Sequence, residues 1–108
     1  MSDIEFHSVA KTDDLDEGEA MQVIIGRKEI AIYNLDGKFY ATDDICTHAY
    51  ASLADGYVEG ELIECPLHGG CFDIKTGKAM TPPVSEDLKT YELKIDGEQI
   101  LIGVPADG

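Results

Sequence analysis

Short runs of alternating apolar and polar residues, separated by glycine-containing turns, dominate both ends of this chain. Ile30 and Ile32 alternate with Glu29, Ala31 and Tyr33. This period of two is typical of a β-strand, because successive side chains of a strand point to opposite faces. A second alternating run, KTYELKI, follows near the C-terminal end. No stretch keeps a helical period over three turns, so the pattern predicts an all-β protein.

Two Asp-Gly pairs divide these runs and predict hairpins. Asp36-Gly37 stands between IAIYNL and KFYAT, and Asp96-Gly97 stands between KTYELKI and EQILIGV. Such pairs favour two-residue turns, because both residues tolerate a positive φ angle. Short strands joined by tight turns predict a small antiparallel β sandwich or barrel.

The middle of the chain, from about residue 44 to residue 83, has a different composition. It holds all three cysteines, five of the eleven glycines and the sequence TPP, and its candidate strands LIECP and CFDIK are short. We therefore expect a loop-rich excursion from one tip of the sandwich. The prediction is a single domain over residues 1–108, with a base formed by about 1–43 and 84–108 and a subdomain formed by about 44–83.

The charge balance narrows the range of partners. The chain carries 22 acidic and 8 basic residues, a net charge of −14. Nucleic acid and anionic membrane surfaces would be repelled, whereas a protein with a basic docking face would be attracted. The same charge is also explained by solubility alone.

The apolar runs and the cysteine count bear on the cellular compartment. The longest apolar runs are far too short to cross a bilayer, and no secretory signal is visible near the first residues. An odd number of cysteines, three, without such a signal argues against a disulfide framework. These features predict a cytoplasmic protein in a reducing environment.

Two pairs of candidate metal ligands lie in the middle region, with sixteen residues between them. Cys46 and His48 form the first pair, and Cys65 and His68 form the second, in the pattern Cys-x-His-x16-Cys-x-x-His. Zinc can bind two cysteines and two histidines in a structural site. A [2Fe–2S] cluster can bind the same set, with two thiolates on one iron and two imidazoles on the other.

The mixed composition of each pair helps to choose between these metals. Zinc fingers usually take both cysteines from one turn and both histidines from one helix. Here each pair supplies one cysteine and one histidine, which favours two irons held between two loops. A zinc-stabilised interaction module is the alternative.

The boxes CTHAY and CPLHGGCFD resemble those of Rieske [2Fe–2S] proteins. The resemblance extends from FHSVA through DGKFYATDDICTH to IKTGKAMTPPVSEDLKTYELKIDG. At this length the chain is similar to the Rieske-type ferredoxins of bacterial aromatic-ring-hydroxylating dioxygenase systems. The resemblance implies one [2Fe–2S] cluster, with Cys46 and Cys65 on one iron and His48 and His68 on the other.

The same resemblance implies a fold and a function. The fold would be a β-sandwich base with a cluster-binding subdomain at one tip, where Pro82 and Pro83 belong to a third loop over the cluster. The chain would be a monomeric one-electron carrier and not an enzyme. It would pass electrons from a flavin-dependent reductase to the Rieske centre of a terminal oxygenase in aromatic hydrocarbon catabolism.

The histidine count separates this chain from a complete oxygenase. Once His48 and His68 bind the cluster, only His7 remains. A mononuclear iron site with two histidines and one carboxylate therefore cannot form within the chain. A detached Rieske domain of a larger oxygenase is the second alternative.

Departures from the respiratory branch of the family predict a low redox potential. The disulfide-forming cysteines of that branch correspond here to Ala51 and Leu67, and its hydroxyl donors to Gly70 and Phe72. A hydroxyl aimed at sulfur stabilises the reduced, more negative cluster, so its loss lowers the potential within the Rieske range of roughly −150 to +300 mV. Cys71 is expected to be a free thiol on a short strand, facing away from a buried Phe72.

Overall fold

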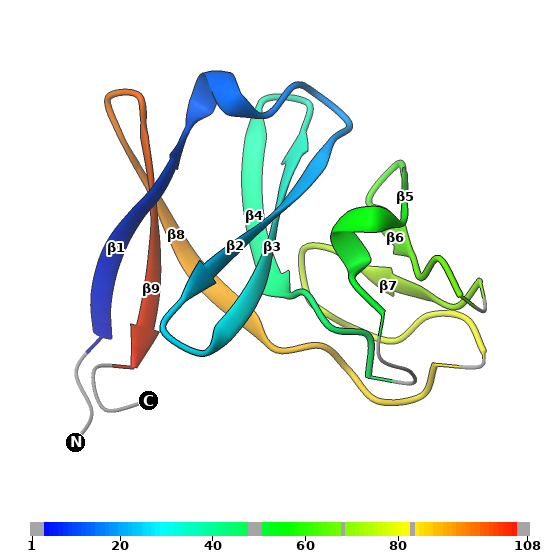
Figure 1. Ribbon diagram of the computed structural model, residues 1–108. Helices are drawn as coiled ribbons and strands as arrows, with labels where there is room; N and C mark the ends of the chain where they lie inside the picture. Colours follow the sequence, from blue (N-terminus) through cyan, green and yellow to red (C-terminus); the bar gives the residue numbers. More distant parts are fainter. Residues whose placement is uncertain (1–3, 48–50, 68, 83, 106–108) are drawn as a thin grey trace.

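The computed structural model describes residues 4–47, 51–67, 69–82 and 84–105 (Figure 1). Its strands are β1 (Ile4–Lys11), β2 (Ala20–Ile25), β3 (Lys28–Leu35), β4 (Lys38–Asp43), β5 (Tyr57–Glu59), β6 (Leu62–Glu64), β7 (Cys71–Asp73), β8 (Thr90–Asp96) and β9 (Gln99–Pro105). Two single-turn 3₁₀ helices, η1 (Thr12–Asp14) and η2 (Leu53–Asp55), complete the regular structure of these ranges. The predicted all-β class is confirmed. No helix in the described ranges is long and apolar enough to cross a membrane.

The strands form two antiparallel sheets. The larger sheet has the order β1-β9-β8-β4-β3-β2, and the smaller has the order β5-β6-β7. The edge strands β1 and β2 also contact each other, so the larger sheet curls toward a barrel. Figure 1 shows this curled sheet on one side and the small sheet, in green shades, on the other. The predicted antiparallel base is therefore present, built from residues near both ends of the chain.

The two predicted hairpins both form, one of them with a shifted turn. Leu35 pairs with Lys38, and both Asp36 and Gly37 have positive φ angles, 57° and 87°. This turn matches the prediction. In the second hairpin β8 continues to residue 96, which pairs with residue 99, so the turn lies at 97 and 98 rather than at 96 and 97. The glycine thus takes the first turn position, where a type II′ turn needs a positive φ angle.

Strand β3 separates two apolar cores. Ile30 and Ile32 point into the core inside the curled sheet, whereas Ala31 and Tyr33 point into a core on the opposite face. The first core is completed by Leu15, Val23, Ala41, Ile100, Ile102 and Val104. The second contains Cys46, Leu53, Ile63, Cys65, Phe72, Ile74, Val84 and Leu88. Because both of its faces are covered, β3 is buried along most of its length, and the second core joins the base to the small sheet.

Candidate metal centre

Cys46, the described residue of the first predicted pair, follows the end of β4 in the first loop, of which the structure describes residues 45–47 and 51–52. Ile45 forms an isolated antiparallel bridge with Ser52, and the N–H of Cys46 donates a 3.0 Å hydrogen bond to the carbonyl of Ala51. The side chain of Cys46 is 4% exposed and lies in the second core. These contacts close the loop on itself and hold the cysteine in an apolar environment.

Asp44, between β4 and this first loop, is fully buried. Its carboxylate accepts hydrogen bonds from Gln22 Nε2 at 2.7 Å, from Ser52 Oγ at 2.6 Å and from the N–H of Ala54 at 2.9 Å. Its carbonyl accepts a further bond from the N–H of Leu53 at 2.7 Å. The buried carboxylate is therefore well satisfied. Through these bonds Asp44 fixes both ends of the first loop and ties it to β2.

Cys65, the described residue of the second predicted pair, follows the end of β6 in the second loop, of which the structure describes residues 65–67 and 69–70. The N–H of Cys65 donates to the carbonyl of Gly70 at 2.7 Å, and the N–H of Gly69 donates back to the carbonyl of Cys65 at 3.2 Å. Cys65 is 1% exposed. A Cβ atom on Gly70 would lie 2.7 Å from Cγ1 of Val84, closer than side chains pack. The loop is thus tightly turned and pressed against the segment around Val84.

The segment at residues 80–88 connects the two loops. The N–H groups of Met80 and Thr81 both donate to the carbonyl of Cys71, at 2.8 and 3.3 Å. On the other side, the hydroxyl of Thr47 in the first loop donates to the carbonyl of Glu86 at 2.8 Å. This segment therefore contacts both candidate ligand loops.

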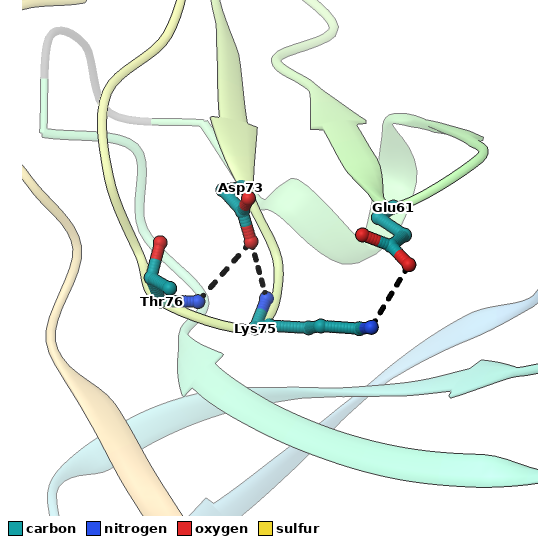
Figure 2. A network of polar contacts seen from close by, with 4 residues as sticks. All are labelled: Glu61, Asp73, Lys75 and Thr76. Carbon is teal, nitrogen blue, oxygen red and sulfur yellow. Dashed lines mark hydrogen bonds and ion pairs between the residues drawn. The ribbon is translucent and has the colours of Figure 1, made fainter.

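The turn after β7 anchors the small sheet beside the base. Figure 2 shows the carboxylate of Asp73 accepting hydrogen bonds from the N–H groups of Lys75, at 2.8 Å, and Thr76, at 3.2 Å. The ammonium group of Lys75 lies 2.8 Å from a carboxylate oxygen of Glu61 and 6.0 Å from the ring centre of Tyr40 in β4. The carboxylate of Glu61 raises the pKa of Lys75. Lys75 thus pairs with Glu61, between β5 and β6, and lies near Tyr40 of β4.

The structure describes two of the four predicted ligands, Cys46 and Cys65. Cys46 and Cys65, which are nineteen residues apart in sequence, are brought into one buried cluster. His48 and His68 lie outside the described residues, as does Pro83 of the predicted third loop. Within the described ranges, no three His, Cys, Asp or Glu side chains gather as a metal site. Two buried cysteines on separate closed loops fit iron–sulfur ligation, because thiolates are the ligands of such clusters, and the four-residue set stays a prediction.

The predicted alternation on β7 is confirmed. Phe72 is fully buried, and Cys71 is half-buried with its thiol 3.7 Å from the carbonyl of Gly69. Cys71 forms no disulfide. Burial raises the pKa of the Cys71 thiol. Cys71 therefore lies on the opposite face of the strand from the core that contains Cys46 and Cys65.

Comparison with known proteins identifies the family. The family profile of the Rieske [2Fe–2S] domain matches residues 5–92. The chain belongs to the Rieske [2Fe–2S] domain family. It is 48% identical over 90 residues to the ferredoxin component of the naphthalene 1,2-dioxygenase/salicylate 5-hydroxylase systems of a Ralstonia species, covering 83% of this chain and 86% of that one.

Solved structures agree with this assignment. The ferredoxin of Sphingomonas yanoikuyae B1 superposes with a TM-score of 0.89 at 38% identity, covering 94% of this Rieske protein and all of that chain. A chain in the complex of reduced oxygenase and oxidised ferredoxin of carbazole 1,9a-dioxygenase superposes with a TM-score of 0.85 at 34% identity. The superposition covers 90% of this protein and 91% of that chain. The predicted Rieske cluster, and the prediction of an electron carrier rather than an enzyme, are confirmed by these relatives.

Proposed function

We propose that this Rieske ferredoxin carries single electrons from a flavin-dependent reductase to the Rieske centre of a terminal aromatic-ring-hydroxylating oxygenase. The observation that carries the proposal is its 48% identity, over most of both chains, to a ferredoxin component of a naphthalene dioxygenase system. The similarity to a chain in a ferredoxin–oxygenase complex supports an oxygenase as the electron acceptor. The flavin-dependent donor follows from the resemblance described above.

The ligands in this proposal are Cys46, His48, Cys65 and His68. When bound, the Rieske cluster takes up and releases one electron at a time. Both cysteines are buried in the second core, with 4% of Cys46 and 1% of Cys65 exposed. The first loop is closed by Asp44, so the position of Cys46 is set by the fold. Fixed ligands lower the reorganisation that accompanies a change of charge.

The organisation of the chain is part of the proposal. We assign residues 1–43 and 84–108 to the base and residues 44–83 to a cluster-binding subdomain within one domain. The larger sheet supports this division, because its strands lie at 4–43 and 90–105. The 48% identity to a ferredoxin component supports an electron carrier as the proposed role. We also propose that the protein is a monomer and that it is located in the cytoplasm.

Reconstitution with purified components tests the proposal. The chain is added to its flavin-dependent reductase, its terminal oxygenase, reduced nicotinamide and an aromatic substrate. We expect product to form only when the chain is present, and at a rate that rises with its concentration. An oxygenase that turns over equally fast without the chain, or a chain that accepts no electrons from the reductase, would contradict it.

A further inference from the structure

A positively charged hollow lies beside the first loop, on an otherwise strongly acidic molecule. It measures about 310 Å³ and is lined by Arg27 in the β2–β3 turn, Lys28 at the start of β3 and Lys89 just before β8. These are three of the chain's eight basic residues. Two acidic residues, Glu29 and Asp43, also line it. The local formal charge is therefore +1, from three positive and two negative groups, against −14 for the chain.

The positive charges of this hollow are available to a ligand. The two ion pairs of the described residues lie elsewhere and include neither Arg27, Lys28 nor Lys89. Asp43 accepts a 2.5 Å hydrogen bond from the hydroxyl of Tyr91, and its negative charge is included in the local sum. Lys89 lies 5.5 Å from the ring centre of the same Tyr91. The hollow thus presents cations around an acid that is already hydrogen-bonded.

The hollow adjoins the candidate electron-transfer site. Ile45, which lines it, directly precedes Cys46 in the first loop. We propose that the hollow receives a carboxylate side chain of a redox partner protein and fixes the orientation in which that partner docks beside the first loop. This inference rests on the proposed function, because it concerns the partners named there.

Charge complementarity supports a carboxylate as the occupant. The net charge of −14 draws in the basic face of a partner from any direction, so by itself it gives attraction without orientation. One positive site within a negative field favours only those encounters in which an acidic group of the partner meets it. The hollow would therefore add specificity to an attraction that the whole molecule provides.

Three charge-reversal variants distinguish the effect of the charges in the hollow from the effect of the net charge of the chain. Arg27→Glu and Lys89→Glu change the hollow, whereas Lys11→Glu changes the end of β1, which does not line it. Each lowers the formal net charge by two, from −14 to −16. The rate constants for reduction by the reductase and for oxidation by the oxygenase are measured by stopped flow at low salt. Cluster absorption checks that each variant is intact.

We expect Arg27→Glu and Lys89→Glu to slow at least one of the two reactions by about tenfold, while Lys11→Glu slows neither. The milder Arg27→Gln should fall between wild type and Arg27→Glu. If the hollow variants behave like Lys11→Glu in both reactions, the inference is wrong and the proposed function stands. Wild-type protein that exchanges electrons with neither partner would overturn the proposed function and this inference together.

Discussion

The base and the cluster-binding part of this protein are stabilised in different ways. In the base, strands of six to eight residues form an antiparallel sheet over a core in which Ile30, Ile32, Ile100 and Ile102 are fully buried. Around the candidate ligands the strands have three residues each, and the loops depend on single polar groups such as Asp44. Stability is thus spread over many contacts in the base and concentrated in a few in the loops. A single substitution should therefore disrupt a loop while the base remains folded.

The largest effect is expected from Asp44→Ala. The change leaves the donors of Gln22, Ser52 and Ala54 without their acceptor, at a cost of about 1–3 kcal/mol for each donor that stays buried. We expect the first loop to open and most chains to lose iron, while the far-ultraviolet circular dichroism of the base is retained. Iron content per chain and thermal unfolding measure both effects.

Asp44→Asn is the matched control for this experiment. It keeps the size of the side chain and one acceptor oxygen, so it should lose less iron than Asp44→Ala. An Asp44→Ala protein with full iron content and an unchanged melting temperature would contradict the role of this residue.

A core substitution in the base should give the opposite pattern. Ile100→Val removes one methylene group from a fully buried side chain and should lower the free energy of unfolding by about 0.5–1.5 kcal/mol. Because the core inside the curled sheet does not include the two cysteines, iron content and midpoint potential should not change. Urea unfolding and voltammetry provide the two measurements, and a shifted potential would show that the two regions are coupled.

The redox potential should respond to a hydroxyl introduced at Phe72. Its ring lies in the same buried core as Cys46 and Cys65. A hydrogen bond to a charged group contributes on the order of 1.5–3 kcal/mol, of which only the difference between redox states counts. Since about 59 mV corresponds to a tenfold change for one electron, Phe72→Tyr should raise the midpoint potential by some tens of millivolts up to about 100 mV.

Protein-film voltammetry on Phe72→Tyr with an intact cluster tests this expectation, and an unchanged potential would contradict it. Gly70→Ser does not offer an equivalent test. A Cβ atom there would lie 2.7 Å from Val84 and 3.3 Å from the carbonyl of Thr81. We expect that variant to displace the segment at 80–88 and to lower stability.

The smallest effect is expected on the rate of electron transfer, when a single acidic residue in either region is neutralised. Glu86 lies in the segment that contacts both loops, whereas Glu17 lies in the acidic stretch before β2. If the charge steers a partner to the loops, Glu86→Gln should slow electron transfer about two- to threefold at low salt, and Glu17→Gln should have less effect. The difference should vanish between about 0.01 and 0.15 M salt, where the screening length falls from roughly 30 to 8 Å. Equal rates for both variants at low salt would indicate that the acidic charge serves solubility and does not steer the partner.

Much of the base could be predicted from local patterns. The turn at Asp36 and Gly37 has a specific dihedral requirement, and the alternation of Cys71 and Phe72 follows from the geometry of any strand. The burial of both faces of β3 could not be predicted in the same way. Ala31 and Tyr33 are buried by the small sheet, whose position depends on contacts distant in sequence.

The candidate site shows a similar division. The spacing of the cysteines and histidines predicted the cluster, because ligand chemistry is carried by residue type. The role of Asp44 was missed, since Asp43 and Asp44 are neighbouring acids and charge alone does not distinguish them. Asp43 bonds Tyr91, and Asp44 points inward to close the first loop. The only available signal was its position between a strand and a predicted ligand loop.

Metal and sulfide analysis combined with electron paramagnetic resonance tests the central claim, that two loops of this chain hold a two-iron cluster which takes up one electron. The purified protein should contain two irons and two sulfides per chain, show no signal when oxidised and show a spin-½ signal after reduction with dithionite. His48→Ala and His68→Ala should each lose that signal, whereas His7→Ala should keep it. One zinc per chain, no sulfide and no signal after reduction would contradict the account.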